Sequence, residues 1–262
     1  MLDDVLNDLA AEGDRLEALV APLTEEQWRT ATPAEGWDIA TTIAHLAWTD
    51  EVAVYAATDK EAWDNQVMGA IMNPTGYVDE QAALGAAVAP AELLGRWQAA
   101  RPALAKTLAE FPVGEKIMWF GPPMSPASMA SARFMETWAH GLDVADALGV
   151  ELEPTDRIRH VAHIGVRTRN YAFTNAGFEK PTEEFRVVLI APSGELWTYG
   201  PEDAAQTVTG SADDFCRLVT QRVHRDDTDL VAVGEDAEQW LRIAQAFAGP
   251  AGGGRPAKGE GN

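Results

Sequence analysis

The stretch Phe134-Met-Glu-Thr-Trp-Ala-His-Gly-Leu-Asp143 is the most informative part of this chain. Its apolar residues are compatible with a helix, and Glu136 and His140 stand four positions apart. Residues at positions i and i+4 of a helix lie on one face, so this carboxylate and this imidazole can bind one metal ion together. A solvated helix face has the same spacing. A metal site therefore needs a third ligand from elsewhere in the chain.

Helical patterns extend from this stretch across the first 150 residues. Apolar side chains recur at helical spacing over residues 2–21, from Ile39 to Val52 behind an N-cap at Asp38, and over residues 90–110 and 127–148, with Gly149 as a stop signal. Residues 58–88 are less regular, and Asn73-Pro-Thr-Gly76 reads as a turn. Four long helices with a longer second connection predict a four-helix bundle, whose metal sites use inward side chains of different helices.

The second half of the chain changes character after a helical segment over residues 155–173. Residues 184–191 and 196–199 flank the turn Pro192-Ser-Gly194 as in a β-hairpin, residues 206–209 can add a strand, and helices over 211–223 and 236–247 are expected to pack on this sheet. We therefore predict an α+β protein. Its parts are a four-helix metal-binding domain over 1–150, a connecting helix and linker over 151–182, an α+β domain over 183–249 and a disordered tail over 250–262.

Composition narrows the class of protein. The net charge is -21, the acidic residues are dispersed, and 46% of residues are hydrophobic. This favours a protein with a proper core and argues against nonspecific binding to nucleic acid or anionic membranes. The first residues lack the pattern of a signal peptide, and no apolar stretch reaches membrane-spanning length. We expect a cytoplasmic monomer or homodimer that acts on a small molecule.

Cys216 is the single cysteine, so an internal disulfide is impossible. It stands in a helical pattern without a basic neighbour that would activate it, and such cysteines are usually inert members of the core. If the chemistry needs a thiol, a small molecule is expected to supply it.

His45 is the candidate for the third ligand. It lies in the apolar second helix, where a histidine should be partly buried and needs a polar partner. That partner is either a backbone carbonyl or a metal shared with Glu136 and His140. The second alternative requires the second and fourth helices to be neighbours in the bundle.

Two motifs resemble a known family. The stretch Thr32-Pro-Ala-Glu-Gly-Trp-Asp-Ile-Ala-Thr-Thr-Ile-Ala-His-Leu-Ala47 resembles the helix-two signature of the DinB-like metal-binding superfamily, in which a Pro-Gly-Trp-like start leads to a ligating histidine followed by Leu-Ala. It looks most like the branch containing mycothiol-dependent maleylpyruvate isomerase. Residues 136–143 resemble the second motif of that family, Glu-x-x-x-His with a trailing Asp, and the order of the motifs matches.

The resemblance continues through the second half. Residues 191–200, 208–216 and 240–249 resemble the sterol-carrier-like C-terminal domain of the same family. The resemblance thus covers nearly the whole chain except its tail, and it implies a DinB-like four-helix bundle followed by a small sterol-carrier-like α+β domain. Carried over position by position, it implies that His45, Glu136 and His140 are the metal ligands and act in catalysis through the metal.

This ligand set suits a divalent ion. Two imidazoles and one carboxylate favour zinc, while nickel, iron and manganese stay open. Three protein ligands leave positions for a substrate, and one carboxylate against a divalent cation leaves positive charge that favours an anionic ligand. The resemblance implies mycothiol as thiol cosubstrate. Its thiolate would add to an activated cis double bond, which rotates before elimination, or would be transferred to an electrophile.

Several residues are secondary candidates for the site. Asp143 can orient His140 or can be a solvated residue near the end of the helix. His163 and Arg167, with His160, can form an anion-binding edge of a pocket between the domains, where a solvated helix face is the alternative. Arg96 and Arg101 are weaker candidates of the same kind. Trp37 and Trp48 are expected in the bundle core, and His224 on the surface.

Two other functional classes fit the same ligands. A DinB-like metalloenzyme of another reaction type, such as a hydrolase or an enzyme of specialised metabolism, would use the three ligands without a thiol. A metal-stabilised binding protein would hold the ion without catalysis.

Overall fold

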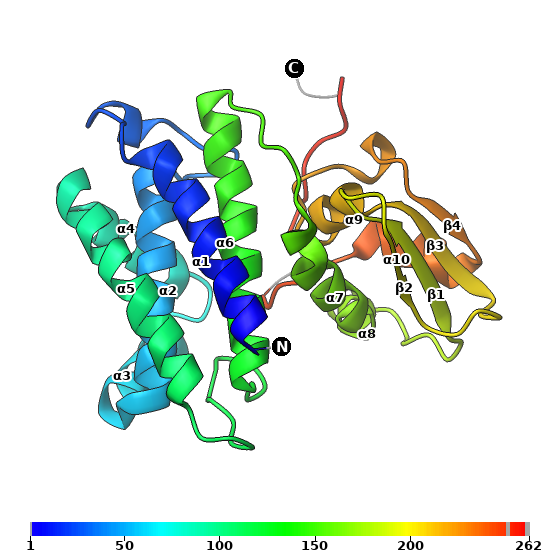
Figure 1. Cartoon of the computed structure of the whole chain (residues 1–262), viewed down its shortest axis with the longest axis horizontal. Coiled ribbons are helices and arrows are strands. Elements are labelled where there is room, and N and C mark those ends of the chain that lie inside the picture. The colour runs from blue at the N-terminus through cyan, green and yellow to red at the C-terminus, as the bar shows by residue number, and fades with distance from the viewer. Residues whose placement is uncertain (1, 250–251, 260–262) are drawn as a thin grey trace. The chain divides into compact units, whose positions relative to one another are not determined.

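The computed structural model describes residues 2–249 and 252–259, and the chain divides into two compact units, Met1–Leu152 and Glu153–Asn262. The first unit is helical and the second combines helices with a four-stranded sheet (Figure 1). The predicted α+β class, with a DinB-like helical bundle before a small α+β domain, is confirmed.

Six α-helices make up the described part of the first unit. They are α1 (Leu2–Val20), α2 (Ile39–Thr58), α3 (Lys60–Met72), α4 (Tyr77–Ala86), α5 (Pro90–Glu110) and α6 (Pro126–Leu148), with a short 3-10 helix at Gln27–Arg29. Asp38 caps α2, because its side chain accepts a hydrogen bond from the Thr41 backbone N–H at 2.7 Å. Gly149 ends α6 with φ of 65°, a conformation that glycine adopts without strain.

The helix α2 lies at the centre of the bundle. It packs against α4, α5 and α6, while α1 packs against α6. Figure 1 shows the four long helices, α1, α2, α5 and α6, side by side. Ile39, Ile43 and Leu46 of α2 are completely buried. Because α2 and α6 are neighbours, side chains of the second and fourth long helices can meet.

Residues 58–88, whose pattern was expected to be less regular, are mostly helical, because α3 and α4 occupy most of the segment. Asp59 caps α3 by accepting from the Ala62 backbone N–H at 3.0 Å. The apolar residues Met68, Ile71 and Met72 are exposed, so α3 lacks the alternation of apolar and polar faces that reveals a helix in a sequence. The turn at residues 73–76 is confirmed.

The helices of the second unit are shorter than expected. Residues 155–173 contain a 3-10 helix (Asp156–Ile158), α7 (Arg159–Arg167) and α8 (Arg169–Asn175) rather than one helix. Thr168 separates α7 from α8, and its hydroxyl donates to the backbone carbonyls of Ile164 and Gly165. Such bonds compete with the helical backbone pattern. Two further helices, α9 (Ala212–Val219) and α10 (Glu235–Ile243), end four residues before their predicted ends, 223 and 247.

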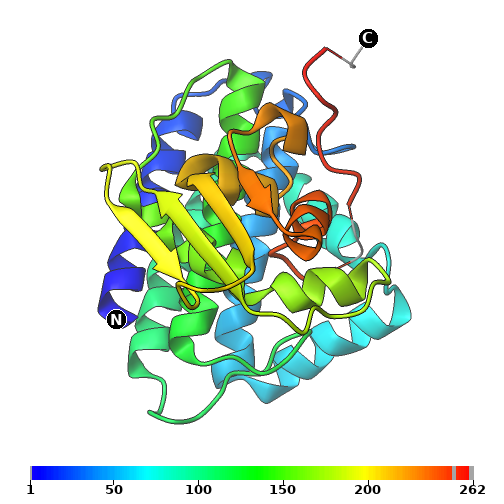
Figure 2. The ribbon, with the colours of Figure 1, turned by 90° about the vertical axis from the view of Figure 1, so that its right-hand side faces the viewer.

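The sheet has the strand order β2-β1-β3-β4 (Figure 2). Its strands are β1 (Phe185–Ile190), β2 (Leu196–Tyr199), β3 (Gln206–Ser211) and β4 (Val231–Val233). The predicted hairpin β1–β2 is antiparallel, β3 runs parallel to β1, and β4 pairs antiparallel with β3. The strand β4 was not predicted from the sequence, because three residues are too few to show the alternation of apolar and polar side chains that is typical of a strand.

The predicted tail lies partly outside the described residues, which exclude 250, 251 and 260–262. Between them, residues 252–259 form neither helix nor strand, and the Lys258 backbone N–H donates to Asp227 Oδ2 at 2.8 Å. The disordered tail stays a prediction.

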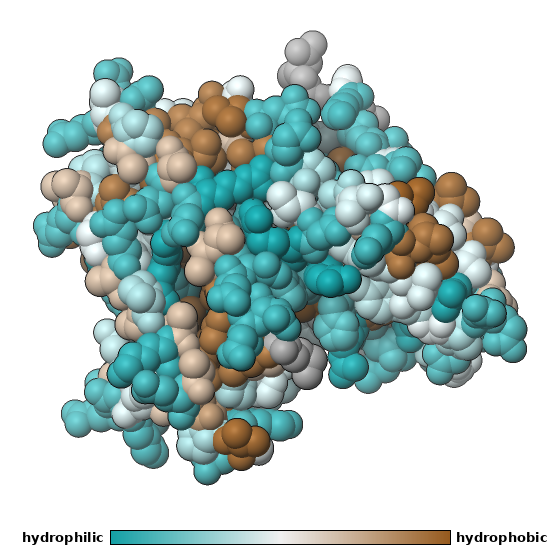
Figure 3. All heavy atoms as spheres, in the orientation of Figure 1, coloured by the Kyte–Doolittle hydropathy of each residue, from teal (hydrophilic) through white to brown (hydrophobic). Residues whose placement is uncertain are grey.

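Most residues on the face shown in Figure 3 are hydrophilic, with hydrophobic ones in smaller groups. Within the described part of the chain, no helix has both the length and the apolar character needed to cross a bilayer.

Candidate metal centre

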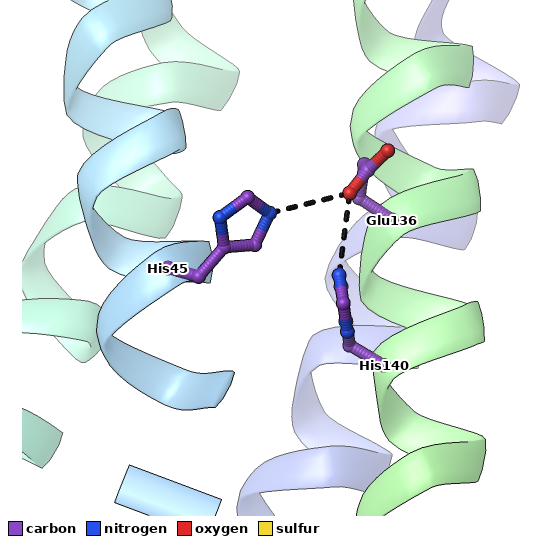
Figure 4. Close-up of side chains that lie close together, drawn as sticks. All are labelled: His45, Glu136 and His140. Carbon is purple, nitrogen blue, oxygen red and sulfur yellow. Dashed lines mark hydrogen bonds and ion pairs between the residues drawn. The ribbon is translucent and has the colours of Figure 1, made fainter. Parts of the chain in front are cut away.

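His45, Glu136 and His140 meet between α2 and α6 (Figure 4). His45 Nε2 lies 3.3 Å and His140 Nε2 lies 3.4 Å from the same atom, Glu136 Oε2. His45 lies on α2, which packs against α6, and the four-residue spacing on α6 places Glu136 and His140 on one face of that helix. The three residues named from the sequence are thus brought together.

The donor atoms are spaced as a metal ion requires. One ligand atom from each of the three residues lies within 4.8 Å of the other two. Two ligands bound at about 2.1 Å to a tetrahedral ion lie roughly 3.4 Å apart, which matches the two contacts of Glu136 Oε2. Imidazole nitrogens and a carboxylate oxygen are the donors that zinc and related divalent ions take in proteins. The residues therefore fit the implied metal.

Asp143 fixes the orientation of His140. Its Oδ2 lies 3.2 Å from His140 Nδ1, and a carboxylate at that distance selects the tautomer with hydrogen on Nδ1. In the neutral ring this leaves the Nε2 lone pair facing Glu136 Oε2. Either a proton on Nε2 or a metal ion can bridge Nε2 and the carboxylate oxygen, and a ligand histidine is usually held by a second carboxylate in this way.

Protonation also favours metal binding. Burial, more than any other cause, lowers the pKa of His45 to about 4, although its contact with Glu136 opposes the shift. His45 is therefore neutral at neutral pH, the form that binds metals. Burial alone would raise the pKa of Glu136, but its contacts with His140 and His45 outweigh that effect and hold the pKa well below its usual value.

The site is buried on one side and open on the other. The side chains of His45 and His140 are 9% and 11% exposed, whereas that of Glu136 is 25% exposed. His45 Nδ1 is buried and makes no hydrogen bond within the described residues. Solvent can thus reach the carboxylate while protein encloses the imidazoles, an arrangement suited to an ion with positions left for a small molecule.

Trp37 contacts the site, contrary to the expectation that it belongs to the bundle core. Its indole stacks on His140 and lies tilted against His45, with ring centroids 5.6 and 5.1 Å apart. The indole N–H donates to Asp79 Oδ1 at 2.9 Å. Trp37 precedes α2 in a loop, so no helical period could assign it a face. Trp48 is buried, as expected.

The sequence reasoning also missed a buried ion pair beside the ligands. Arg133 of α6 donates from Nε to Asp50 Oδ1 of α2 at 2.8 Å. Burial raises the pKa of the Asp50 carboxyl, while the charge and hydrogen bond of Arg133 favour its ionised form. Both residues lie in helices that were predicted from the sequence, over residues 39–52 and 127–148, but only their contact across 83 residues marks them.

The candidate anion-binding residues lie in the second unit. His163 and Arg167 are exposed on α7, and the ring of His163 lies 6.4 Å from that of Tyr199, centroid to centroid. Partial burial and the positive charge of Arg167 lower the pKa of His163. His160 lies on the same helix and is half-buried. Their role in binding an anion stays a prediction.

The remaining candidates have structural partners. Arg96 bonds to Glu51 through two nitrogens, and Arg101 pairs with Asp14 and Glu17. Both arginines therefore join helices of the bundle.

The last two expectations concern residues of the second unit. His224 is half-buried and caps a short 3-10 helix (Arg225–Asp227) rather than facing solvent freely. Cys216 is completely buried, and burial raises the pKa of its thiol well above its usual value.

Two family models match parts of the chain. Residues 9–145 match the family model of the mycothiol maleylpyruvate isomerase N-terminal domain, and residues 181–233 match the model described as wyosine base formation. Two proteins from strains of Mycobacterium tuberculosis, both named only as uncharacterized, are each 57% identical to the chain over 248 residues, which covers 95% of this chain and 96% of each relative.

Solved structures share the fold. The chain is similar to the crystal structures of mycothiol-dependent maleylpyruvate isomerase and of a histidine-to-alanine mutant of that enzyme, with a TM-score of 0.59 to each and identities of 16% and 17%. Each match covers 88% of this chain and 92% of the other. At such identity the likeness establishes the fold alone, whereas the sequence match over more than half of the chain establishes descent. The chain belongs to the mycothiol maleylpyruvate isomerase N-terminal domain family.

Proposed function

We propose that this protein is a metal-dependent enzyme that uses a low-molecular-weight thiol, such as mycothiol, for isomerisation or S-transfer. His45, Glu136 and His140 would hold a divalent ion, with zinc the first choice. The observation that carries the proposal is the convergence of both imidazole Nε2 atoms on Glu136 Oε2, at 3.3 and 3.4 Å. Membership of the family and the shared fold with mycothiol-dependent isomerases support the choice of thiol.

The residues of the chain prepare the site for an anion. Asp143 keeps the proton of His140 on Nδ1 and leaves Nε2 free to bind. His45 is neutral, so Glu136 supplies the one negative charge of the ligand set. When bound, a divalent metal lowers the pKa of a coordinating thiol so that it is present as thiolate at neutral pH.

The thiol chemistry has two forms that this site can serve. In isomerisation the thiolate sulfur bonds to one carbon of an activated cis double bond, and the electron pair moves toward the conjugated carbonyl. Rotation about the new single bond and return of the electron pair expel the thiolate and leave the trans isomer. In S-transfer the sulfur displaces a leaving group instead. Both need an electrophilic substrate, and an anionic one suits the charge of the site.

We also propose that Arg167 and His163, both in the second unit, bind an anionic group of a small molecule. Because the pKa of His163 is lowered, its ring is neutral at neutral pH and Arg167 supplies the charge. We place the enzyme in the cytoplasm as a monomer or homodimer without a nucleic-acid partner, in keeping with its acidic composition.

A turnover assay tests the proposal. The zinc-loaded protein is mixed with mycothiol and either maleylpyruvate or a thiol-reactive electrophile, and isomerisation or adduct formation is followed. We expect turnover only with both zinc and mycothiol present. If the protein converts other substrates with zinc but without a thiol, the proposed use of a thiol is wrong and the enzyme has another reaction type. Tight zinc binding without turnover of any electrophile would instead indicate a non-catalytic metal-binding protein.

A further inference from the structure

Asp50 and Arg133 form a buried ion pair between the two helices that carry the candidate metal ligands. Arg133 Nε donates a hydrogen bond to Asp50 Oδ1 at 2.8 Å. The side chain of Arg133 is 3% exposed, and that of Asp50 is 4% exposed. Asp50 belongs to α2, as His45 does, and Arg133 belongs to α6. The pair thus joins the same two helices that the metal site must bring together.

We propose that Asp50 and Arg133 are positioning residues of the metal centre. Their ion pair sets the rotation and height of α2 against α6, so that His45 reaches Glu136 and His140. This inference rests on the proposed metal site, and it assigns a role to two residues outside the proposed set of three ligands.

The pair lies close to the ligands along both helices. Arg133 precedes Glu136 by three residues and His140 by seven, so the three side chains share one face of α6. Asp50 follows His45 by five residues, which is about 7.5 Å along the axis of α2. Over that distance, a movement of α2 along its axis or a rotation about it at Asp50 displaces His45 by nearly the same amount.

Apolar packing alone holds α2 with less precision. Ile39, Ile43 and Leu46 are completely buried, but hydrophobic burial is non-directional. A metal site tolerates errors of only about 0.2 Å in its ligand distances. A hydrogen-bonded ion pair has a preferred distance and angle, so it restricts the motions that would separate the ligands.

Stability gives a weaker reason for this pair. Apolar residues of similar size often replace a buried ion pair without loss of stability, because desolvation offsets the attraction between the charges. Arg133 Nη2 is also buried and has no hydrogen-bond partner among the described residues, which adds to the cost of burying the guanidinium. Placement of the ligands explains why a charged pair stands here.

A neighbouring ion pair provides a matched control. Glu51, the next residue of α2, accepts hydrogen bonds from Arg96 Nε and Nη2 at 2.7 and 2.6 Å. Arg96 belongs to α5, which carries none of the three candidate ligands. This pair joins α2 to a helix outside the metal site.

The test compares zinc affinity in the full chain by competition with a chromophoric chelator. In Asp50→Leu/Arg133→Met we expect the dissociation constant to rise at least about tenfold, as for other residues that support metal ligands. In Glu51→Gln/Arg96→Met we expect less than about a twofold change. The unfolding midpoints of the metal-free proteins should differ by no more than about 3 °C. An unchanged constant in Asp50→Leu/Arg133→Met overturns the proposal.

Arg133→Lys keeps the test decisive if the double variant does not fold. Lysine retains the charge but lacks the planar fork of donors, so the protein should fold and its zinc dissociation constant should still rise several-fold. Wild-type affinity in Arg133→Lys overturns the positioning role. Absence of zinc binding by the wild-type protein would be a different result, since it overturns the proposed metal centre and this inference with it.

Discussion

The indole of Trp37 lies almost parallel to the imidazole of His140, with 5.6 Å between ring centroids and 14° between ring planes. The same indole lies tilted against His45 at 5.1 Å and is anchored through its N–H to Asp79. One side chain therefore contacts both imidazoles of the candidate metal centre. Because it restricts both rings, it should contribute to metal affinity.

Removing this contact should loosen the metal site. We expect Trp37→Ala to raise the zinc dissociation constant about tenfold, and Trp37→Phe to retain most of the affinity because a ring still packs on His140. Chelator competition measures both. The control is Trp119→Ala, since Trp119 stacks on Trp63 in the same unit. Equal affinities in Trp37→Ala and wild type would refute the role of Trp37.

The carboxylate of Asp143 should matter to the metal and not to the fold. Asp143→Asn replaces the carboxylate that accepts a hydrogen bond from His140 Nδ1–H with an amide. The NH2 group of that amide can face His140 in place of its oxygen. We expect zinc affinity to fall about 10- to 100-fold with the helical signal in circular dichroism unchanged. Asp146→Asn, an exposed position on the same helix, is the control. A fall of equal size in both variants would argue against the assigned contact.

Metal removal should destabilise the first unit selectively. Zinc at 100 times its dissociation constant raises the free energy of unfolding by about 2.7 kcal/mol, so a chelator should lower the unfolding midpoint of this unit by several degrees. Differential scanning calorimetry with and without chelator measures the shift. In His45→Ala, the chelator should not shift the unfolding midpoint. A shift of the same size in that variant would mean that zinc binds elsewhere.

Cys216 should be inert in the folded protein. Its thiol is buried, donates to the Ile158 backbone carbonyl at 3.4 Å, and has a pKa raised well above its usual value. A raised pKa leaves little thiolate, the reactive form, so labelling by a thiol reagent should stay slow from about pH 7 to pH 9 and become complete after denaturation. Rapid labelling of the native protein, to one label per chain, would contradict this account.

Local signals account for the parts of the fold that were predicted well. The helix at residues 90–110 was predicted with the bounds of α5, and that at 127–148 within one residue of α6, because apolar periodicity and end signals agree there. In α3 the apolar residues Met68 and Met72 face solvent, so periodicity could not reveal that helix. The ligand set depended on resemblance to a family, since the spacing of Glu136 and His140 alone left a solvated face open.

The contacts that support the ligands could not be predicted in the same way. Asp50 and Arg133 are 83 residues apart, and Trp37 and Asp79 are 42 apart. Each pairing depends on how helices and loops pack in three dimensions, which no local period encodes. A single sequence shows such residues as ordinary polar or aromatic positions.

The metal content of the purified protein tests the central claim most directly. After dialysis against zinc and removal of free ions, elemental analysis should give about one zinc per chain for the wild type and for His160→Ala/His224→Ala, which lacks two histidines outside the site. His45→Ala/His140→Ala should fold, as judged by circular dichroism, and retain almost no zinc. Equal zinc content in wild type and His45→Ala/His140→Ala would contradict the account.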